Sequence, residues 1–277
     1  MKTFRKILAL LLAAVMMLSL SACGTFELKL AKGMKNLAEY ENFHADVSLS
    51  MSYGVEFLGR TLDLGTDINY AADIQKEPFK MSMRTDVSLM DINGTLYGYM
   101  ENQGNSCVVA ASADGEEWNS ETVDAPELPD SGEAAAIGVA LSKYLGNFRK
   151  AGNTEQVGGS EAQRYDGSIS GSDLKELLEV TGGADKLDDE LEGGYNPAMI
   201  DDDCEIPMAL WLDRKTGVIL KAEAELGSII EGIVRETVRT ELELPEDVEL
   251  NINVSSAYLS IRLSQFDAVD EIRSPLK

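Results

Sequence analysis

Hydrophobic and polar residues alternate along several segments of the chain, beginning near residue 44. In the first such segment, apolar side chains occupy every second position and serines stand between them, at Val47, Leu49, Met51 and Tyr53. The same period of two recurs over residues 62–74, 79–89, 218–226 and 248–263. Successive side chains of a strand point to opposite faces, so each segment predicts a strand with one apolar and one polar face. Such strands are typical of antiparallel sheets that are covered on one side.

Three segments instead carry apolar residues at spacings of three and four, which predicts helices. They are residues 26–40, 133–150 and about 172–181, with Ser172 as the N-terminal cap of the last one and Gly182 beyond its end. Turns are expected to start at Asn93-Gly94, at Gly104-Asn105 and within residues 213–217.

The order of these elements predicts an α+β fold. A helix comes first, then about five strands, a helical insertion at about 130–183 that contains a short strand near residues 163–168, and four or five further strands. Both strand sets need a cover for their apolar face, and no linker-like spacer separates them. We therefore expect residues 23–277 to form one domain, a curved antiparallel sheet of about 9–11 strands wrapped around two or three helices.

The first residues have the three parts of a secretion signal. Lys2, Arg5 and Lys6 make a basic start, an apolar run covers 7–20, and Ser21-Ala22-Cys23 follows. This ending resembles the lipobox of bacterial lipoproteins, in which the cysteine is diacylated and becomes the N-terminus. Residues 1–22 are therefore expected to be removed, leaving the protein lipid-anchored through Cys23 on the extracytoplasmic face of the cell membrane.

The charge of the chain limits its partners. Its formal net charge is −24, from 48 acidic and 24 basic residues. Nucleic-acid binding requires a basic surface, so this class of partner is excluded. An acidic surface is also repelled by anionic lipids, so the lipid on Cys23 has to provide the attachment to the membrane.

Few residues suit catalysis or metal binding. His44 is the single histidine, no CxxC pair occurs, and no string has the GxSxG spacing of a hydrolase nucleophile. The acidic loop at 185–203 lacks the alternating pattern of a calcium loop, which favours a solvated loop over a cation site. We expect no enzyme activity, no cofactor and no metal. Cys107 and Cys204 could pair in an oxidising compartment, and the sequence leaves that disulfide open.

The predicted apolar face of the sheet is the remaining candidate site. Methionines are frequent on it, and their side chains adapt to irregular ligands. Two interpretations stay open: a plain core filled by the helices, or the lining of a pocket for a hydrophobic ligand. The candidate lining residues are Leu49, Met51, Tyr53, Phe79, Met81, Met83, Leu89, Tyr99, Met208 and Leu210.

Three stretches carry a resemblance to a known family: residues 37–51, 93–100, and 206–213 with Thr216-Gly217. With the order of elements, they resemble the LolA-like lipoprotein superfamily, which includes the LolA/LolB carriers and the LppX/LprG-type lipid-binding lipoproteins. Within it, the chain is most similar to uncharacterised exported lipoproteins of monoderm bacteria. The resemblance implies a half-barrel with an apolar cavity for acyl chains and no catalytic residues.

These observations support one leading hypothesis and one alternative. The first is a membrane-anchored, non-enzymatic lipoprotein that binds or carries a lipid or another hydrophobic ligand. The alternative is a structural or sensory module of the cell envelope, with a closed core, that contacts another envelope protein and binds no small molecule.

Overall fold

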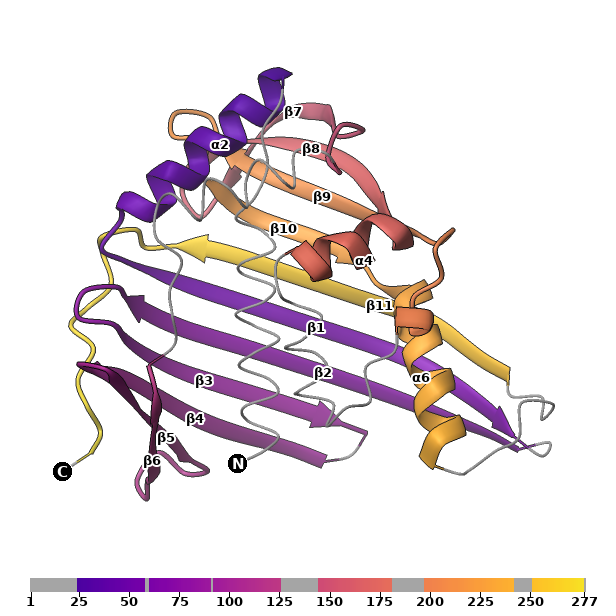
Figure 1. The fold of residues 1–277 in the computed structure, drawn as a ribbon, viewed down its shortest axis with the longest axis horizontal. Coiled ribbons are helices and arrows are strands. Elements are labelled where there is room, and N and C mark those ends of the chain that lie inside the picture. Colours follow the sequence, from indigo (N-terminus) through magenta and orange to yellow (C-terminus); the bar gives the residue numbers. More distant parts are fainter. Residues whose placement is uncertain are drawn as a thin grey trace.

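The chain folds around one large open sheet. The computed structural model describes residues 24–57, 60–90, 92–125, 144–180, 197–241 and 251–276. Within them, eleven strands form a sheet in the order β6-β5-β4-β3-β2-β1-β11-β10-β9-β8-β7 (Figure 1). Every neighbouring pair of strands is antiparallel. The predicted open antiparallel sheet is therefore confirmed.

The first half of the sheet is a series of hairpins that follow one helix. Consecutive strands pair with each other throughout this half. The elements are α2 (Gly24–Glu39), β1 (Asn42–Phe57), β2 (Arg60–Gln75), β3 (Lys80–Leu89), β4 (Ile92–Gln103), β5 (Ser106–Ser112) and β6 (Asn119–Asp124).

The second half runs back from the other edge of the sheet to its centre. Its last strand lies between β1 and β10 and thereby joins the two halves. The elements are β7 (Arg149–Val157), β8 (Ser160–Ser170), α4 (Gly171–Val180), the short 3-10 helix η1 (Pro197–Met199), β9 (Glu205–Asp213), β10 (Ile219–Glu225), α6 (Gly227–Glu241) and β11 (Asn251–Ser264).

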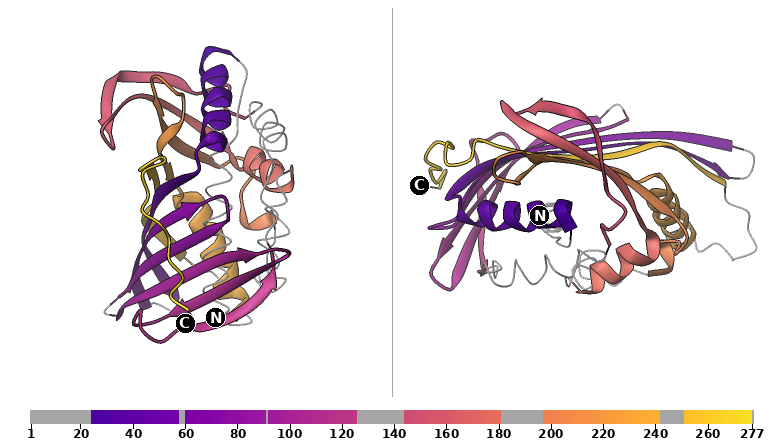
Figure 2. Two further views of the ribbon diagram at one scale, coloured as in Figure 1. Left: turned by 90° about the vertical axis from the view of Figure 1, so that its left-hand side faces the viewer. Right: turned by 90° about the horizontal axis from the view of Figure 1, so that it is seen from above.

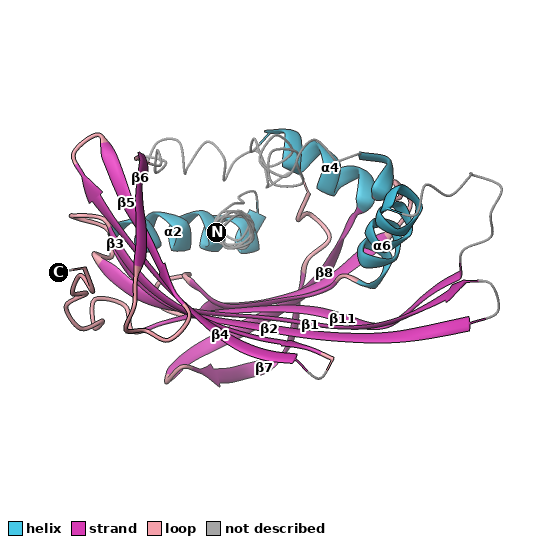
Figure 3. Cartoon of the chain, turned by 90° about the horizontal axis from the view of Figure 1, so that it is seen from below, coloured by secondary structure: helices cyan, strands magenta, loops and turns pink. Residues whose placement is uncertain are grey.

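The sheet is strongly curved, and its helices lie on one side of it. Figure 2 and Figure 3 show α2, α4 and α6 on the concave side. We call this side the inner face and the opposite side the outer face. An apolar sheet face must be covered to leave water, and the helices cover part of it.

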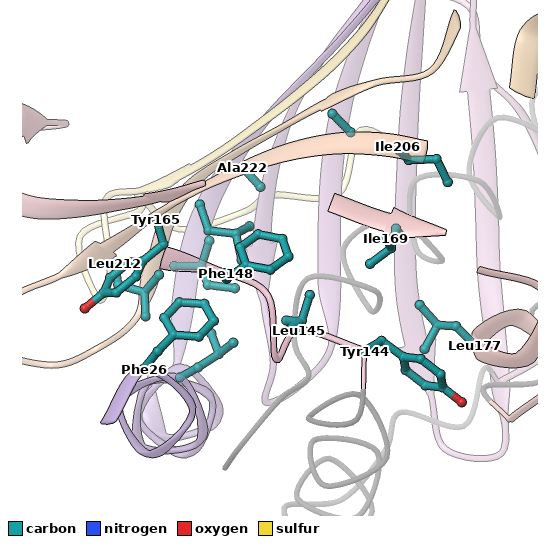
Figure 4. Close-up of a cluster of buried hydrophobic side chains, with 14 of the residues drawn as sticks. Phe26, Tyr144, Leu145, Phe148, Tyr165, Ile169, Leu177, Ile206, Leu212 and Ala222 are labelled. Carbon is teal, nitrogen blue, oxygen red and sulfur yellow. The ribbon is translucent and has the colours of Figure 1, made fainter. Parts of the chain in front are cut away.

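Two hydrophobic clusters occupy the inner face. The helix-covered cluster joins α2 to the second half of the sheet (Figure 4); it includes Phe26, Leu30, Met34, Tyr144, Leu145, Phe148, Tyr165, Ile169, Leu177, Ile206, Leu210, Leu212 and Ala222. The methionine cluster lies on the first half; it includes Phe43, Ala45, Val47, Tyr70, Ala72, Phe79, Met81, Met83, Met100, Cys107, Ile261 and Leu263.

Helix α2 is docked on the turn between β9 and β10. Gly33 lies so close to this turn that a Cβ atom added to it would be 1.9 Å from the carbonyl oxygen of Gly217. Beside this contact, the amide of Asn36 donates a hydrogen bond to the carbonyl oxygen of Thr216 at 2.6 Å. The turn is held by Asp213, whose carboxylate accepts hydrogen bonds from the backbone N–H groups of Lys215 and Thr216 at 2.8 and 2.7 Å. The predicted turn over 213–217 is thus confirmed.

The helical insertion predicted at about 130–183 needs correction. Residues 133–143 of the helix expected at 133–150 lie outside the described residues, but Arg149 and Lys150 begin strand β7. Because β7 is an edge strand with a register irregularity between Ala151 and Glu155, it lacks the alternation that marks the central strands. Strands β7 and β8 extend the sheet, and helix α4 follows them.

Two local predictions are also wrong in detail. Helix α4 is present, but its cap is Ser170, whose hydroxyl accepts a hydrogen bond from the N–H of Asp173 at 3.1 Å; Ser172 is already inside the helix. Asn93-Gly94 lies within β4, because Leu89 pairs directly with Ile92 and the preceding hairpin turns at Met90, with φ of 52°. The turn at Gly104 is confirmed, with φ of 73° and Gln103 paired to Ser106.

The C-terminal segment after β11 covers part of the outer face. Ile272 packs with Tyr99 and Ala110, and Trp118 contacts the same cluster. The segment is tied to the start of β1, where the carboxylate of Asp267 accepts a hydrogen bond from the N–H of Glu41 at 2.6 Å. The outer face of β4 and β5 is therefore shielded by the chain's own end.

Candidate ligand-binding face of the sheet

The strand register arranges the inner face of β1 to β4 in rows. Two buried rows lie near the end of α2: Phe43, Ile74, Met81 and Met100, and then Ala45, Ala72 and Met83. The middle row is Val47, Tyr70, Thr85 and Leu96. Two open rows follow: Leu49, Ile68 and Val87, and then Met51, Thr66, Leu89 and Ile92. Since directly paired residues point to the same face, these rows form one continuous surface.

The exposure of this surface rises from row to row. Met83 and Val47 are 3% and 4% exposed, in the buried and middle rows. In the open rows Leu49 and Met51 are half-buried, whereas Leu89 and Ile92 are 39% and 68% exposed. The apolar surface therefore extends beyond the packed core and reaches solvent at the far ends of the strands.

Most of the predicted lining residues lie on this surface. Phe79, Met81 and Met83 belong to the methionine cluster. Leu49, Met51 and Tyr53 continue along β1 as half-buried side chains, and Leu89 lies at the exposed end of β3.

The other two predicted inner residues, Met208 and Leu210, belong to a different cluster. Leu210 is buried in the helix-covered cluster and Met208 packs against it. The structure therefore divides the predicted lining between a closed part under the helices and a part that becomes exposed.

Tyr99 was predicted to line the pocket, but it does not lie on the inner face. Tyr99 and Met100 are neighbours in β4, so their side chains point to opposite faces, and Met100 is on the inner face. Tyr99 lies on the outer face under the C-terminal segment, and its hydroxyl donates a hydrogen bond to Glu101 at 3.0 Å. Burial raises the pKa of Tyr99 to about 12. The alternation within β4 could have excluded Tyr99 from the sequence alone.

The inner face is uncharged over most of its central strands. From Phe43 to Val55 of β1, and at the paired positions of β2, β3, β4 and β11, no inward position carries an acidic or basic residue; Arg60, the first residue of β2, pairs with Phe57 at the end of this face. Its polar groups include the hydroxyls of Tyr70 and Thr85, two residues that are paired across β2 and β3. Burial raises the pKa of Tyr70 far above its ordinary value, so it stays protonated. The surface suits uncharged, mainly apolar molecules.

Comparisons with known proteins give solved structures that are similar to this chain. The crystal structure of LprF from Mycobacterium bovis is 11% identical, with a TM-score of 0.44, and covers 92% of this chain and 99% of that one. A LolA superfamily protein from Nitrosomonas europaea is 10% identical, with a TM-score of 0.18, covering 90% and 96%. A DUF1329 family protein from Desulfovibrio piger is 9% identical, with a TM-score of 0.22, covering 88% and 93%.

No protein-family model matches the chain, and no curated protein matches it. The geometry of the site described here comes from this chain's own strand register.

Cys107 and Cys204, for which the sequence leaves a disulfide possible, lie in different hydrophobic clusters. Cys107 is fully buried in the methionine cluster, while Cys204 packs against the helix-covered cluster. Both are free thiols in the structure. Cys23 and the whole signal segment 1–22 lie outside the described residues.

The outer face has a hollow that could be mistaken for a polar site. It has a volume of about 310 Å³ and is lined by Asp67, Asn69, Asp86, Val87, Ser88, Asn93, Gly94 and Thr95. Hydrogen bonds from Thr95 and Arg84 lower the pKa of Asp86, so it remains a carboxylate and cannot serve as a proton donor near neutral pH. No group of side chains suited to a metal ion occurs in the described part of the chain. Asp201, Asp202 and Asp203 are exposed, and 181–196 of the acidic loop lies outside the described residues.

His44 lies on the outer face of β1, between two carboxylates. Its Nδ1 is 2.7 Å from Asp73 and its Nε2 is 3.2 Å from Asp46. Partial burial lowers the pKa of His44, but the hydrogen bonds to Asp73 and Asp46 outweigh this effect and raise it overall. The single histidine therefore has a structural ion-pair role in the sheet.

This raised pKa predicts a small pH dependence of stability. The contribution of His44 is fully present below the unfolded value near pH 6.5 and is lost as the pH rises through the higher folded value. His44→Gln should therefore lower the free energy of unfolding at pH 6 by up to about 1 kcal/mol, and by less at pH 9. Urea unfolding of both proteins at the two pH values measures this; an equal difference at pH 6 and pH 9 would contradict the assigned role.

Proposed function

We propose that the protein is an extracytoplasmic lipoprotein, anchored through Cys23, that binds or carries a lipid or another hydrophobic ligand on the inner face of its sheet. The observation that carries this proposal is the continuous apolar surface of the middle and open rows. A sheet face built only as a core would end in buried side chains, whereas here Leu89 and Ile92 are 39% and 68% exposed. Exposed apolar surface that continues from a core is typical of ligand-binding grooves.

The composition of this surface fits a flexible ligand. Met51 lies in an open row and Met81 and Met83 lie in the adjoining buried rows, and methionine side chains adapt their shape to irregular partners. Apart from Arg60, the first residue of β2, the inward positions of β1 to β4 carry no charge, which favours an acyl chain over a polar metabolite. No catalytic group is assigned, and the proposed activity is binding.

The membrane attachment in this proposal depends on Cys23 alone. Among the described residues, no helix is both long and apolar enough to cross a membrane. Helix α2 begins at Gly24, directly after Cys23, and is docked on the β9–β10 turn. A lipid on Cys23 would therefore hold the folded domain close to the bilayer, where acyl lipids are available to it.

The test is ligand binding by detergent-free protein. Native mass spectrometry should detect co-purified lipid, and a fluorescent fatty-acid probe should bind. Met51→Glu places a charge in an open row and should weaken probe binding at least roughly tenfold, because a buried methionine contact is worth about 1.5–3 kcal/mol.

Ser52→Glu is the matched control, since Ser52 is exposed on the outer face of the same strand. Its probe affinity should equal that of the unaltered protein. A protein that carries no lipid and takes up no probe would overturn the proposal and favour the alternative, an envelope module with a closed core.

A further inference from the structure

One hydroxyl group of the middle row is buried without a hydrogen-bond partner. Thr85 is 1% exposed, and its Oγ1 has no partner among the described residues. Tyr70, its neighbour across the sheet, is 8% exposed, and its hydroxyl is not among the fully buried atoms that lack a partner. A buried polar group without a partner is costly, and such groups are uncommon in native proteins. The hydroxyl of Thr85 on an apolar face therefore calls for a functional explanation.

The two residues are direct neighbours across the sheet. Tyr70 of β2 is paired with Thr85 of β3, which places their Cβ atoms about 4.5–5.5 Å apart on the same face. Val47 and Leu96 flank them in the same row. Tyr70 and Thr85 are thus the two polar residues of an otherwise apolar row.

The middle row is also the boundary between buried and exposed surface. On one side Ala45, Ala72 and Met83 are at most 3% exposed, and on the other side Leu49, Ile68 and Val87 are half-buried. An apolar chain that lies along the open rows would reach its inner limit at Tyr70 and Thr85. A polar atom at that end of the ligand would lie beside this pair of residues.

The lack of charge around Tyr70 and Thr85 restricts the kind of polar group that a ligand can place there. Anions in a buried site need a cation or several strong donors, and in the middle row and the rows directly beside it no inward position carries a lysine, arginine or histidine. The raised pKa of Tyr70 keeps its hydroxyl a neutral donor. A neutral acceptor, such as an ester carbonyl, satisfies both hydroxyls without burying a charge.

We propose that Tyr70 and Thr85 form a polar subsite that hydrogen-bonds the ester carbonyl of an uncharged acyl lipid, with its acyl chain along the open rows. This proposal rests on the proposed function and narrows its ligand to neutral acyl esters. The ligand reaches Oγ1 of Thr85 by displacing a neighbouring side chain, and Met83, two residues away on the same face, is a pliable one.

The experiment compares an ester with a hydrocarbon. Purified full-length protein is titrated with dioctanoylglycerol and, separately, with hexadecane, each by displacement of a fluorescent acyl probe. The Tyr70→Phe/Thr85→Val double variant removes both hydroxyls with little change of shape. Its affinity for dioctanoylglycerol should fall roughly tenfold, and its affinity for hexadecane should stay unchanged.

Two outer-face substitutions provide the matched control. Tyr258→Phe and Thr122→Val remove the same two hydroxyls from exposed positions of β11 and β6. Their double variant should bind both compounds as the unaltered protein does. The Tyr70→Phe/Thr85→Val variant should also melt at an equal or higher temperature, since the buried hydroxyl of Thr85 has no partner in the ligand-free fold.

The outcomes separate this proposal from the proposed function. If neither compound displaces the probe from any variant, the proposed function fails. If hexadecane and dioctanoylglycerol both bind, and the double variant binds each of them as before, only the subsite is overturned. Tighter binding of octanoate at pH 8 than of dioctanoylglycerol also overturns it, because the pair would then recognise an anion.

Discussion

Replacement of Cys23 by serine is expected to release the protein completely from the membrane fraction. A serine cannot receive the thioether-linked lipid, and the acidic chain, with a net charge of −24, has no electrostatic attraction to anionic lipids. Two acyl chains give stable anchoring, since each buried methylene contributes about 0.8 kcal/mol. Fractionation of cells and labelling with an alkyne fatty acid measure the change.

Cys204→Ser is the control for this experiment. Cys204 is a free, half-buried thiol within the folded domain, so its loss should leave lipid labelling and membrane retention intact. If the Cys23→Ser protein stays in the membrane after a high-salt wash, residues 1–22 would have to act as an uncleaved anchor, and the lipoprotein assignment would be wrong.

Gly33→Ala is expected to destabilise the protein by about 3 kcal/mol, the upper end for overpacking of a core. The added Cβ would lie 1.9 Å from the Gly217 carbonyl oxygen and 2.2 Å from its carbonyl carbon, and neither backbone atom can yield alone. Helix propensity predicts the opposite sign, because alanine favours a helix by about 1 kcal/mol over glycine. The midpoint of urea unfolding distinguishes the two effects: overpacking lowers it, and helix propensity raises it.

Gly227→Ala serves as the matched substitution. Gly227 opens helix α6, and a Cβ atom there would meet nothing within 4 Å. This variant should be neutral or slightly stabilised. A Gly33→Ala protein as stable as the Gly227→Ala protein would show that α2 is not seated on the β9–β10 turn.

The alternating segments predicted the sheet well because packing on one face leaves a direct trace in the sequence. β1, β2 and β3 bury every second residue near α2, as the pattern from Phe43 to Leu89 indicates. The open antiparallel sheet and the helix before it followed from that period. The rising exposure along each strand could not be predicted, since Val47 and Leu49 are equally apolar and differ only in what covers them.

Helix α6 was not predicted, although its residues carry a helical signal. Ile229, Ile230, Ile233 and Val234 recur at spacings of three and four, but β-branched residues favour strands in isolation. Packing overrides this preference: Ile229 is buried in the helix-covered cluster and Ile233 packs against it. Gly232 lies against the backbone of Met199, where a Cβ would be 2.0 Å from the carbonyl oxygen.

The alternation over residues 248–263 changes phase at Ser255-Ser256, yet these residues belong to a single strand, β11. The register against β1 shifts between Ser52 and Tyr53, so that Ser256 pairs with Ser52 and Val254 with Tyr53. The extra residue is a β-bulge, which changes the phase of the alternation and returns Ile252 and Val254 to the same face as Ala257. A change of phase in sequence resembles a turn, and only pairing with a partner strand distinguishes the two.

Only part of the candidate site was predicted, because strand pairing cannot be read from the sequence pattern. Met81 and Met83 were recognised because the apolar period marks the inner face. The pair of Tyr70 and Thr85 was missed, since a single hydroxyl among apolar residues carries no pattern, and its neighbour belongs to another strand. The alternation of apolar residues along one strand does not show which residues of neighbouring strands are paired.

The position of β11 has a consequence for the way the molecule is assembled. This strand is the last of the eleven in the chain, yet it lies in the centre of the sheet, between β1 and β10. Until it emerges from the ribosome or from a translocation channel, β1 and β10 are both unpaired edges, and the two halves cannot be joined. Because these contacts link residues far apart in the chain, the closing step is expected to be slow. The sheet is therefore completed only when the whole chain is present.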